Sequence, residues 1–337
     1  MNSQVTIKDI AKALGISAST VSRALKDHPD ISRDTKDAVN ELAKKLHYKP
    51  NAVALSLKSS KTNTRGVIIP ELVHYFFSSV ISGIEDVAYD AGYNVMICQS
   101  NEKYEREIIN AQALSSNRVE GALISISKET QDYAHLQMLE ESGIPMVFFD
   151  RVPDGFDSDR VIIDDKKAAF NAVCHLIESG CKRIAHLAAP TSLGIGKYRL
   201  EGYKEALLKH NIPYLEDYVI VADSFDLAAV ATRRLIQLPV PPDGIFTVND
   251  LTAVGAMKTL QKVGILIPDK MAIMGFSAGS YSDITTPTLS SVDQHGYEMG
   301  IKAATVLLER IESKREGPGE TFFVETNLVI RESTKKI

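Results

Sequence analysis

Cysteine is scarce in this chain of 337 residues. Cys98, Cys174 and Cys181 are an odd number and show no C-x-x-C spacing, which argues against a disulfide framework or a zinc site and favours a reducing compartment. No apolar run approaches the ~18 residues that a membrane-spanning helix requires. The first nine residues also lack the apolar segment of a secretion signal. We therefore expect a cytoplasmic protein without a membrane partner.

The signatures of common enzyme classes are missing as well. The chain has no G-x-x-x-x-G-K-[ST] phosphate loop and no G-x-S-x-G nucleophile motif. The run Gly194–Arg199 begins like a dinucleotide-binding motif but lacks the third glycine. The eight histidines are scattered without an H-x-x-x-H pair, and His186 lies inside an apolar run, as a core histidine would. We expect no enzymatic activity, no cofactor and no metal ion.

Charge is distributed unevenly along the chain. The net charge of −5 would argue against a nucleic-acid partner if it were taken alone. Residues 1–65, however, contain twelve Lys and Arg against six Asp and Glu, so they carry +6 and the remaining 272 residues carry −11. A basic head on an acidic body indicates a polyanion partner for the head.

The basic head begins with two short predicted helices. Thr6 and Asp9 have the spacing of a capping box, and apolar residues recur at helical spacing after them. Gly15 tolerates the left-handed conformation that ends such a helix, and Ser17 can cap a second helix over residues 18–25. Two short helices joined by about three residues with a glycine are typical of a helix-turn-helix.

A third helix is expected over residues 32–46. In a helix-turn-helix unit the second helix enters the major groove of DNA. Arg23 suits a bidentate contact with guanine, whereas Ala18 offers only a small apolar contact. The residues that face outward on the second helix are Ala18, Ser19, Ser22 and Arg23. Hydroxyl side chains that could hold phosphates are Thr6, Ser17, Thr20 and Ser32. The alternative is a three-helix module with a solvated basic face.

A short helix and a linker are predicted between head and body. Pro50 blocks continuation of the third helix, and Asn51 can cap one further helix of about seven residues, too short to be stable alone in water. The Ser, Thr, Lys and Asn run over residues 59–64 reads as a linker. The short helix is therefore either a spacer or a segment that folds only on a partner.

From Gly66 onward, short apolar runs alternate with longer amphipathic stretches. This alternation predicts an α/β body, and about ten strands favour two doubly wound parallel-sheet subdomains over a single sheet. Ligands of open α/β sheets bind at the carboxyl ends of the strands. Side chains that follow the predicted strands could bond ligand hydroxyls: Asp150, Arg199, Asn249 and Ser277. Aromatic side chains that could stack on a ring are Phe76, Phe77 and Phe225.

Other roles are open for several of these residues. Phe76 and Phe77 would also suit the hydrophobic core. Asp250 opens a predicted helix and is expected to be its N-cap. The chemistry of the set as a whole is that of a site for a small polar ligand such as a sugar or a nucleoside.

Four motifs make the head similar to a known family. Thr6–Ala11, Gly15–Ser17, Thr20–Arg23 and Tyr48–Asn51 through Leu57 resemble the head of the lactose/galactose-repressor family, and the similarity extends over nearly the whole chain. The resemblance implies that Leu57 wedges between base pairs in the minor groove and kinks the operator. It also implies hinge contacts to DNA by the residues Asn51, Ala54, Leu57 and Lys58.

In the body, the resemblance implies an effector crevice. Family members have residues that border this crevice at positions matching Phe77, Asp150, Arg199, Asn249 and Gln294. Ser277 departs from the pattern, since many relatives carry an aspartate there. Leu193 and Ile195 replace polar groups that some relatives use.

These observations predict a helix-turn-helix head over 1–50, a hinge helix and linker over 51–64, and a periplasmic-binding-protein-like body over 65–337. The subdomains of the body are expected at 65–163 with 293–322, and at 164–292 with 323–337. We expect a homodimeric repressor of a sugar-utilisation operon that binds a pseudo-palindromic duplex and responds to a sugar or sugar derivative. The alternatives are a periplasmic-type solute-binding protein without DNA function and an NAD- or sugar-processing enzyme.

Overall fold

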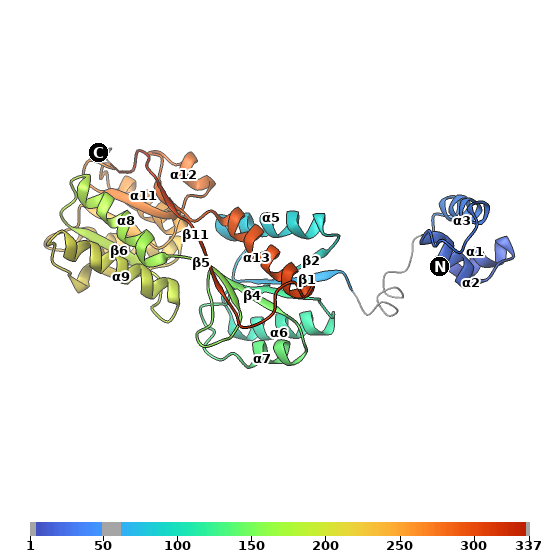
Figure 1. Cartoon of the computed structure of the whole chain (residues 1–337). Helices are drawn as coiled ribbons and strands as arrows, with labels where there is room; N and C mark the ends of the chain where they lie inside the picture. Colours follow the sequence, from blue (N-terminus) through green and yellow to red (C-terminus); the bar gives the residue numbers. More distant parts are fainter. Residues whose placement is uncertain (1–4, 49–61, 335–337) are drawn as a thin grey trace. The chain divides into compact units, whose positions relative to one another are not determined.

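The computed structural model describes residues 5–48 and 62–334 (Figure 1). The chain divides into two compact units, residues 1–62 and 63–337. The predicted hinge residues Asn51, Ala54, Leu57 and Lys58 lie outside the described residues. In the described part of the chain, no helix is both long and apolar enough to cross a membrane.

The first unit is a three-helix head made of α1 (Ile7–Leu14), α2 (Ala18–Leu25) and α3 (Arg33–Lys45). The turn between α1 and α2 follows the local signals, because Gly15 takes the left-handed conformation with φ of 65°. The Ser17 hydroxyl accepts a hydrogen bond of 3.0 Å from the Thr20 backbone N–H and so caps α2. One side chain from each helix, Ile10, Val21 and Val39, is completely buried in the small core.

The second unit contains two six-stranded sheets. The first sheet has the order β11-β5-β4-β3-β1-β2, and all its neighbouring strands run parallel. Its strands are β1 (Thr64–Ile69), β2 (Asn94–Gln99), β3 (Ala122–Ile124), β4 (Met146–Phe149), β5 (Asp159–Ile163) and β11 (Thr321–Val324). The helices beside it are α5 (Tyr75–Asp90), α6 (Tyr104–Ser116), α7 (Ala134–Glu141) and α13 (Gly296–Ile311).

The second sheet has the order β12-β10-β9-β8-β6-β7 and is parallel except for its edge strand β12. Its strands are β6 (Ile184–Ala188), β7 (Val219–Val221), β8 (Gly244–Thr247), β9 (Ala272–Ser277), β10 (Ser290–Asp293) and β12 (Asn327–Val329). Its helices are α8 (Asp165–Glu178), α9 (Gly194–Lys209), α10 (Phe225–Ile236), α11 (Asp250–Lys262) and the short α12 (Ser280–Ile284), with a 3₁₀ turn at Glu216–Tyr218. The body is thus the expected α/β fold of two subdomains.

Two pairs of neighbouring helices pack closely because a glycine lies at each helix–helix contact. Helices α5 and α13 lie side by side in the first subdomain (Figure 1). A Cβ on Gly300 of α13 would lie 2.0 Å from the Val80 carbonyl oxygen of α5. In the second subdomain, a Cβ on Gly202 of α9 would lie 2.2 Å from the Lys166 carbonyl oxygen of α8. A side chain at either position would force the two helices apart.

The chain passes between the subdomains after β5, after β10 and after β11. The last crossing, expected near residue 322, comes after Val324. The physical reason is strand pairing: Phe323 and Val324 are in register with Ile162 and Ile163 in the first sheet. These crossings bring the carboxyl ends of the two sets of strands to one site.

Candidate functional site

A cavity of about 160 Å³ opens among the segments that follow the carboxyl ends of strands in both sheets. This placement agrees with the general rule for open α/β sheets. The predicted residues that line the cavity are Phe76, Phe77, Asp150, Arg199, Asn249, Ser277 and Gln294. Other lining residues include Glu71, His74, Glu102, Lys128, Arg151, Leu193, Ile195 and Asp223.

Phe225 was expected at this cavity but is not among its lining residues. It is the first residue of α10, and its backbone packs against α11, since a Cβ on Gly255 would lie 2.5 Å from the Phe225 carbonyl oxygen. The preceding residues, Asp223 and Ser224, line the cavity instead.

Arg199 of α9 lines the cavity and is buried. Its Nε donates to Asp165 Oδ1 at 2.7 Å, and its Nη1 donates to the Val248 carbonyl oxygen at 2.6 Å. The guanidinium carbon lies 3.6 Å from the centre of the Phe276 ring, a cation–π arrangement. Burial raises the pKa of Asp165, and the charge and hydrogen bond of Arg199 oppose this rise.

The Asp150 carboxylate lines the cavity and is only weakly paired with other side chains. Its side chain is only 6% exposed, and the ion pair found for it among the described residues is a long one, 3.9 Å to Arg151 Nε. Burial raises the pKa of Asp150 to about 6, although Arg151 and Arg199 act in the opposite direction. Its backbone adopts a left-handed φ of 58°, a strained conformation that is common at ligand sites.

The prediction that Asp250 caps α11 was wrong. The cap is Asn249, whose Oδ1 accepts from the Thr252 N–H at 2.8 Å and whose Nδ2 donates to the Asp223 carbonyl oxygen at 3.2 Å. Asp250 is buried and accepts hydrogen bonds from the Gly279 N–H at 2.8 Å and the Ser291 hydroxyl at 2.6 Å. It therefore fixes the end of β9 against β10, and its burial raises its pKa to about 6.

One polar contact and one aromatic contact join further lining residues of the cavity. The Ser277 hydroxyl donates to Gln294 Oε1 at 3.0 Å, which joins the ends of β9 and β10. The rings of Phe76 and Phe77 lie edge to face with centroids 5.2 Å apart, and both side chains are largely buried. The cavity is therefore lined by aromatic rings and by a few polar side chains, a combination typical of small-molecule sites.

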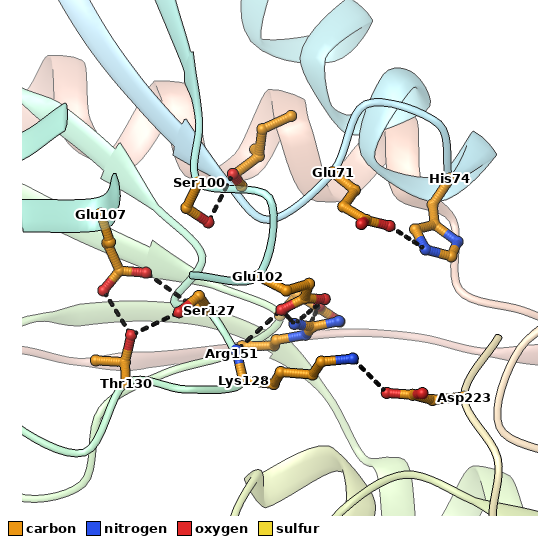
Figure 2. A network of polar contacts seen from close by, with 12 residues as sticks. Glu71, His74, Ser100, Glu102, Glu107, Ser127, Lys128, Thr130, Arg151 and Asp223 are labelled. Carbon is orange, nitrogen blue, oxygen red and sulfur yellow. Dashed lines mark hydrogen bonds and ion pairs between the residues drawn. The ribbon is translucent and has the colours of Figure 1, made fainter. Parts of the chain in front are cut away.

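A network of polar contacts surrounds the cavity on the side of the first sheet (Figure 2). Glu102 accepts two hydrogen bonds of 2.8 Å from Arg151 Nη1 and one of 2.9 Å from the Lys128 backbone N–H. Lys128 then extends its side chain to Asp223 Oδ2 at 3.1 Å. Since Lys128 follows β3 and Asp223 follows β7, this ion pair joins the two subdomains across the cavity.

The buried side chain of Glu107 accepts hydrogen bonds from the loop that carries Lys128 (Figure 2). Glu107 accepts from the Ser127 N–H at 2.6 Å and from the Thr130 hydroxyl at 2.9 Å, and it lies 2.9 Å from His135 Nε2. Sequence reasoning missed Glu102 and Lys128. Both follow apolar runs that become β2 and β3, so the rule that pointed to Asp150 could have pointed to them.

On the head, the structure describes every predicted DNA-contacting residue except those of the hinge. Ser19 and Arg23 of α2 are exposed, while Ala18, Thr20 and Ser22 are half-buried on the same helix. The Ser17 hydroxyl, besides capping α2, lies 2.7 Å from the Ser19 hydroxyl and 2.8 Å from the Thr20 hydroxyl. Thr6 is exposed, and its backbone N–H donates to Asp9 at 2.8 Å, which forms the expected capping box.

Comparison with known proteins gives two family matches. The family described as "Bacterial regulatory proteins, lacI family" matches residues 6–51. The family described as "Periplasmic binding protein-like domain" matches residues 173–334. The first match covers the helical head, and the second covers most of the second subdomain.

Full-length relatives support both matches. The ribose operon repressor of Halalkalibacterium halodurans is 34% identical over 333 residues, which cover 98% of this chain and 97% of the relative. A structure of the transcriptional regulator CelR–cellobiose complex shares 28% identity with a TM-score of 0.74, over 98% of this chain and all of that one. The lac repressor dimer bound to operator and an anti-inducer has the same fold, with a TM-score of 0.87 at 23% identity over 98% of this chain and 99% of that one.

Proposed function

Since the chain belongs to the lacI family of bacterial regulatory proteins, we propose that its head binds operator DNA in a homodimer and that its body binds a small effector, a sugar or sugar derivative. The chain is a DNA-binding transcriptional repressor. The alternative of a solute-binding protein without DNA function is not supported, because residues 6–51 match the family's DNA-binding head. Its relatives are repressors and not enzymes, and we propose that it has no enzymatic activity and acts in the cytoplasm, where operator DNA lies.

The proposal that the head binds DNA rests on the way α2 is held in the head with part of its surface exposed. Ser17 caps the helix, Val21 anchors it in the core, and Ser19 and Arg23 remain exposed, in a part of the chain, residues 1–65, that carries a charge of +6. Arg23 would make the base contact, and the hydroxyls of Thr6, Ser17 and Thr20 would hold phosphates. Two heads of a dimer would bind two half-sites of a pseudo-palindrome.

The effector half rests on the chemistry of the cavity. A sugar ring presents apolar C–H faces and a rim of hydroxyls, which suit Phe76 and Phe77 on one side and Asp150 and Arg199 on the other. One relative is named a ribose operon repressor, and one structural neighbour holds cellobiose. We propose that a sugar occupies the cavity of this chain.

Coupling between the two functions would follow from the position of the cavity. A ligand that contacts both subdomains favours one relative orientation of them, provided that it binds the two orientations with different affinities. The Lys128–Asp223 ion pair of 3.1 Å already spans the two sides and would be retained in one orientation. Movement of the subdomains would then alter operator affinity through the segment that leads to the heads.

The DNA-binding proposal can be tested with Arg23→Ala. We expect the affinity for a duplex selected by the intact chain from a random pool to fall by about 10- to 100-fold, as loss of one bidentate base contact predicts. Lys45→Ala is the matched control, since it removes one positive charge from exposed α3 and leaves α2 intact. It should reduce affinity for all sequences slightly. Equal losses in both variants would exclude base contact by Arg23.

A further inference from the structure

Each cation that lines the cavity forms an ion pair with a carboxylate. Arg199 is paired with buried Asp165 at 2.7 Å, and Arg151 is paired with both oxygens of Glu102 at 2.8 Å. Hydrogen bonds between two charged groups are roughly twice as strong as those between neutral groups. Arg151 Nε has no hydrogen-bond partner among the described residues, so a ligand oxygen could accept from it without displacing Glu102. A phosphate at that position would add negative charge beside the carboxylates that already balance Arg151 and Arg199, which is unfavourable in a poorly solvated site.

The remaining basic side chains are engaged in the same way. Lys128 is paired with Asp223 at 3.1 Å across the cavity (Figure 2). His74 Nε2 lies 3.1 Å from Glu71 Oε2. Burial lowers the pKa of His74, so its ring is disposed to be neutral at pH 7 and adds no cation to the site.

The balance of charge around the cavity is therefore negative. Its lining holds the three cations Lys128, Arg151 and Arg199 against the four carboxylates Glu71, Glu102, Asp150 and Asp223. Asp150 is the carboxylate with the weakest pairing, 3.9 Å from Arg151 Nε, and it is directed toward a cavity that can supply hydroxyl donors. A carboxylate accepts hydrogen bonds from hydroxyls and repels a phosphate.

Helix N-termini could in principle provide an anion site instead. Two that meet the cavity are already capped, α10 by the Ser224 side chain and α11 by the Asn249 side chain. The first turns of α5 and α9 follow His74 and Leu193, which make no side-chain cap. Inorganic phosphate is therefore included in the test below.

From this pairing we infer that the cavity takes an uncharged monosaccharide and discriminates against its phosphate ester. The inference rests on the proposed effector function and specifies the ligand class. The cavity of about 160 Å³ has room for a ligand smaller than drug-sized molecules, whose sites span roughly 300–1,000 Å³. It shares Asp150, Arg151, Leu193 and Ile195 with a neighbouring cavity of about 390 Å³, so the charge of the lining and not its volume carries the inference. The paired carboxylates Glu102 and Asp223 act here as specificity determinants, because they already balance the charge of the cations that a phosphate would need.

The direct test is calorimetric titration of the intact chain with D-ribose, D-glucose and D-fructose, with a phosphate ester of each, and with inorganic phosphate. We expect one of the neutral sugars to bind and its ester to bind at least about 10-fold more weakly, as expected when an ionic group finds no free partner. The inference is overturned if an ester or inorganic phosphate binds as tightly as the best neutral sugar. It is equally overturned if no neutral sugar binds.

A charge-release variant sharpens the test. Glu102→Gln frees Arg151, and it should raise the affinity for the ester by about 10-fold because a free guanidinium pairs with phosphate. Glu129→Gln is the matched control, since Glu129 pairs with Lys103 at 2.5 Å in an exposed position and should change nothing. Asp223→Asn, which frees Lys128, provides a second variant if Glu102→Gln does not fold. Failure of both folded variants to gain ester binding contradicts the role of the carboxylates.

Binding of the intact chain to its selected duplex is measured in parallel. If the duplex is bound and every neutral sugar fails, the ligand inference is wrong while the DNA-binding half of the proposed function stands. If the duplex is not bound, the proposed function itself fails, whatever the sugar titrations give.

Discussion

Arg199→Leu is expected to lower the free energy of unfolding of the second subdomain by about 3–5 kcal/mol, the usual effect of removing one partner from a buried ion pair. Asp165 would be left as a buried carboxylate without its 2.7 Å partner, and the Val248 carbonyl oxygen would lose its donor. The variant should also fail to bind the effector, because Arg199 lines the cavity. Urea unfolding followed by circular dichroism measures the first effect.

The same two helices provide a matched control. Lys166 of α8 and Glu205 of α9 form an ion pair of 2.8 Å whose side chains are about half exposed. Lys166→Leu should change the free energy of unfolding by no more than about 1 kcal/mol, as exposed pairs do. The double variant Arg199→Leu with Asp165→Leu should recover much of the lost stability, because it leaves no unpaired charge. A single variant no less stable than Lys166→Leu would show that Asp165 does not depend on Arg199.

Asp150→Asn is expected to stabilise the protein at pH 8 by about 3 kcal/mol, with no gain below about pH 4. The pKa of Asp150 is raised to about 6 by burial, against 3.8 for an ordinary aspartate. The folded state therefore holds this proton more tightly than the unfolded state. Between pH 3.8 and 6 the unfolded carboxyl ionises while the native carboxyl keeps its proton, so stability falls as the pH rises; above pH 6 the native carboxyl is ionised as well and the loss is constant.

Asparagine reproduces the neutral form of Asp150 and also tolerates the left-handed backbone at this position. Urea unfolding of wild type and variant at pH 8 and pH 3.5 gives the comparison, and the titrations of Asp250 and His186 cancel because both proteins contain them. The variant should bind the effector more weakly, since it loses the carboxylate that accepts ligand hydroxyls. A pH-independent difference in stability would contradict the assignment of this cost to Asp150.

Much of the head was predictable because its signals are local. The Ser17 cap and the left-handed Gly15 act within three or four residues, and the helix expected over 18–25 is observed as Ala18–Leu25. The cavity of the body was predictable in outline, because the carboxyl ends of parallel strands must meet at one edge of a sheet. That rule placed Asp150 and Asn249 at the cavity from sequence position alone.

What sequence reasoning missed depends on backbone conformation or on distant partners. Whether Asn249 or Asp250 caps α11 depends on which of them is extended, and Asn249 has φ of −154° and ψ of 168°. The ion pair of Lys128 with Asp223 joins residues 95 positions apart in two different subdomains. No local sequence pattern reveals such a pair, so only the structure shows that the cations of the cavity form ion pairs with carboxylates.

Ligand bound in the body is expected to change the affinity of the head for DNA. The most direct measurement is the fluorescence anisotropy of a labelled selected duplex, titrated with the intact chain in the absence and presence of a saturating neutral sugar that calorimetry has shown to bind. We expect operator affinity to change by about 5- to 150-fold and the duplex to change sugar affinity by the same factor. A sugar that fills the cavity of wild type, and leaves operator affinity unchanged, would contradict it.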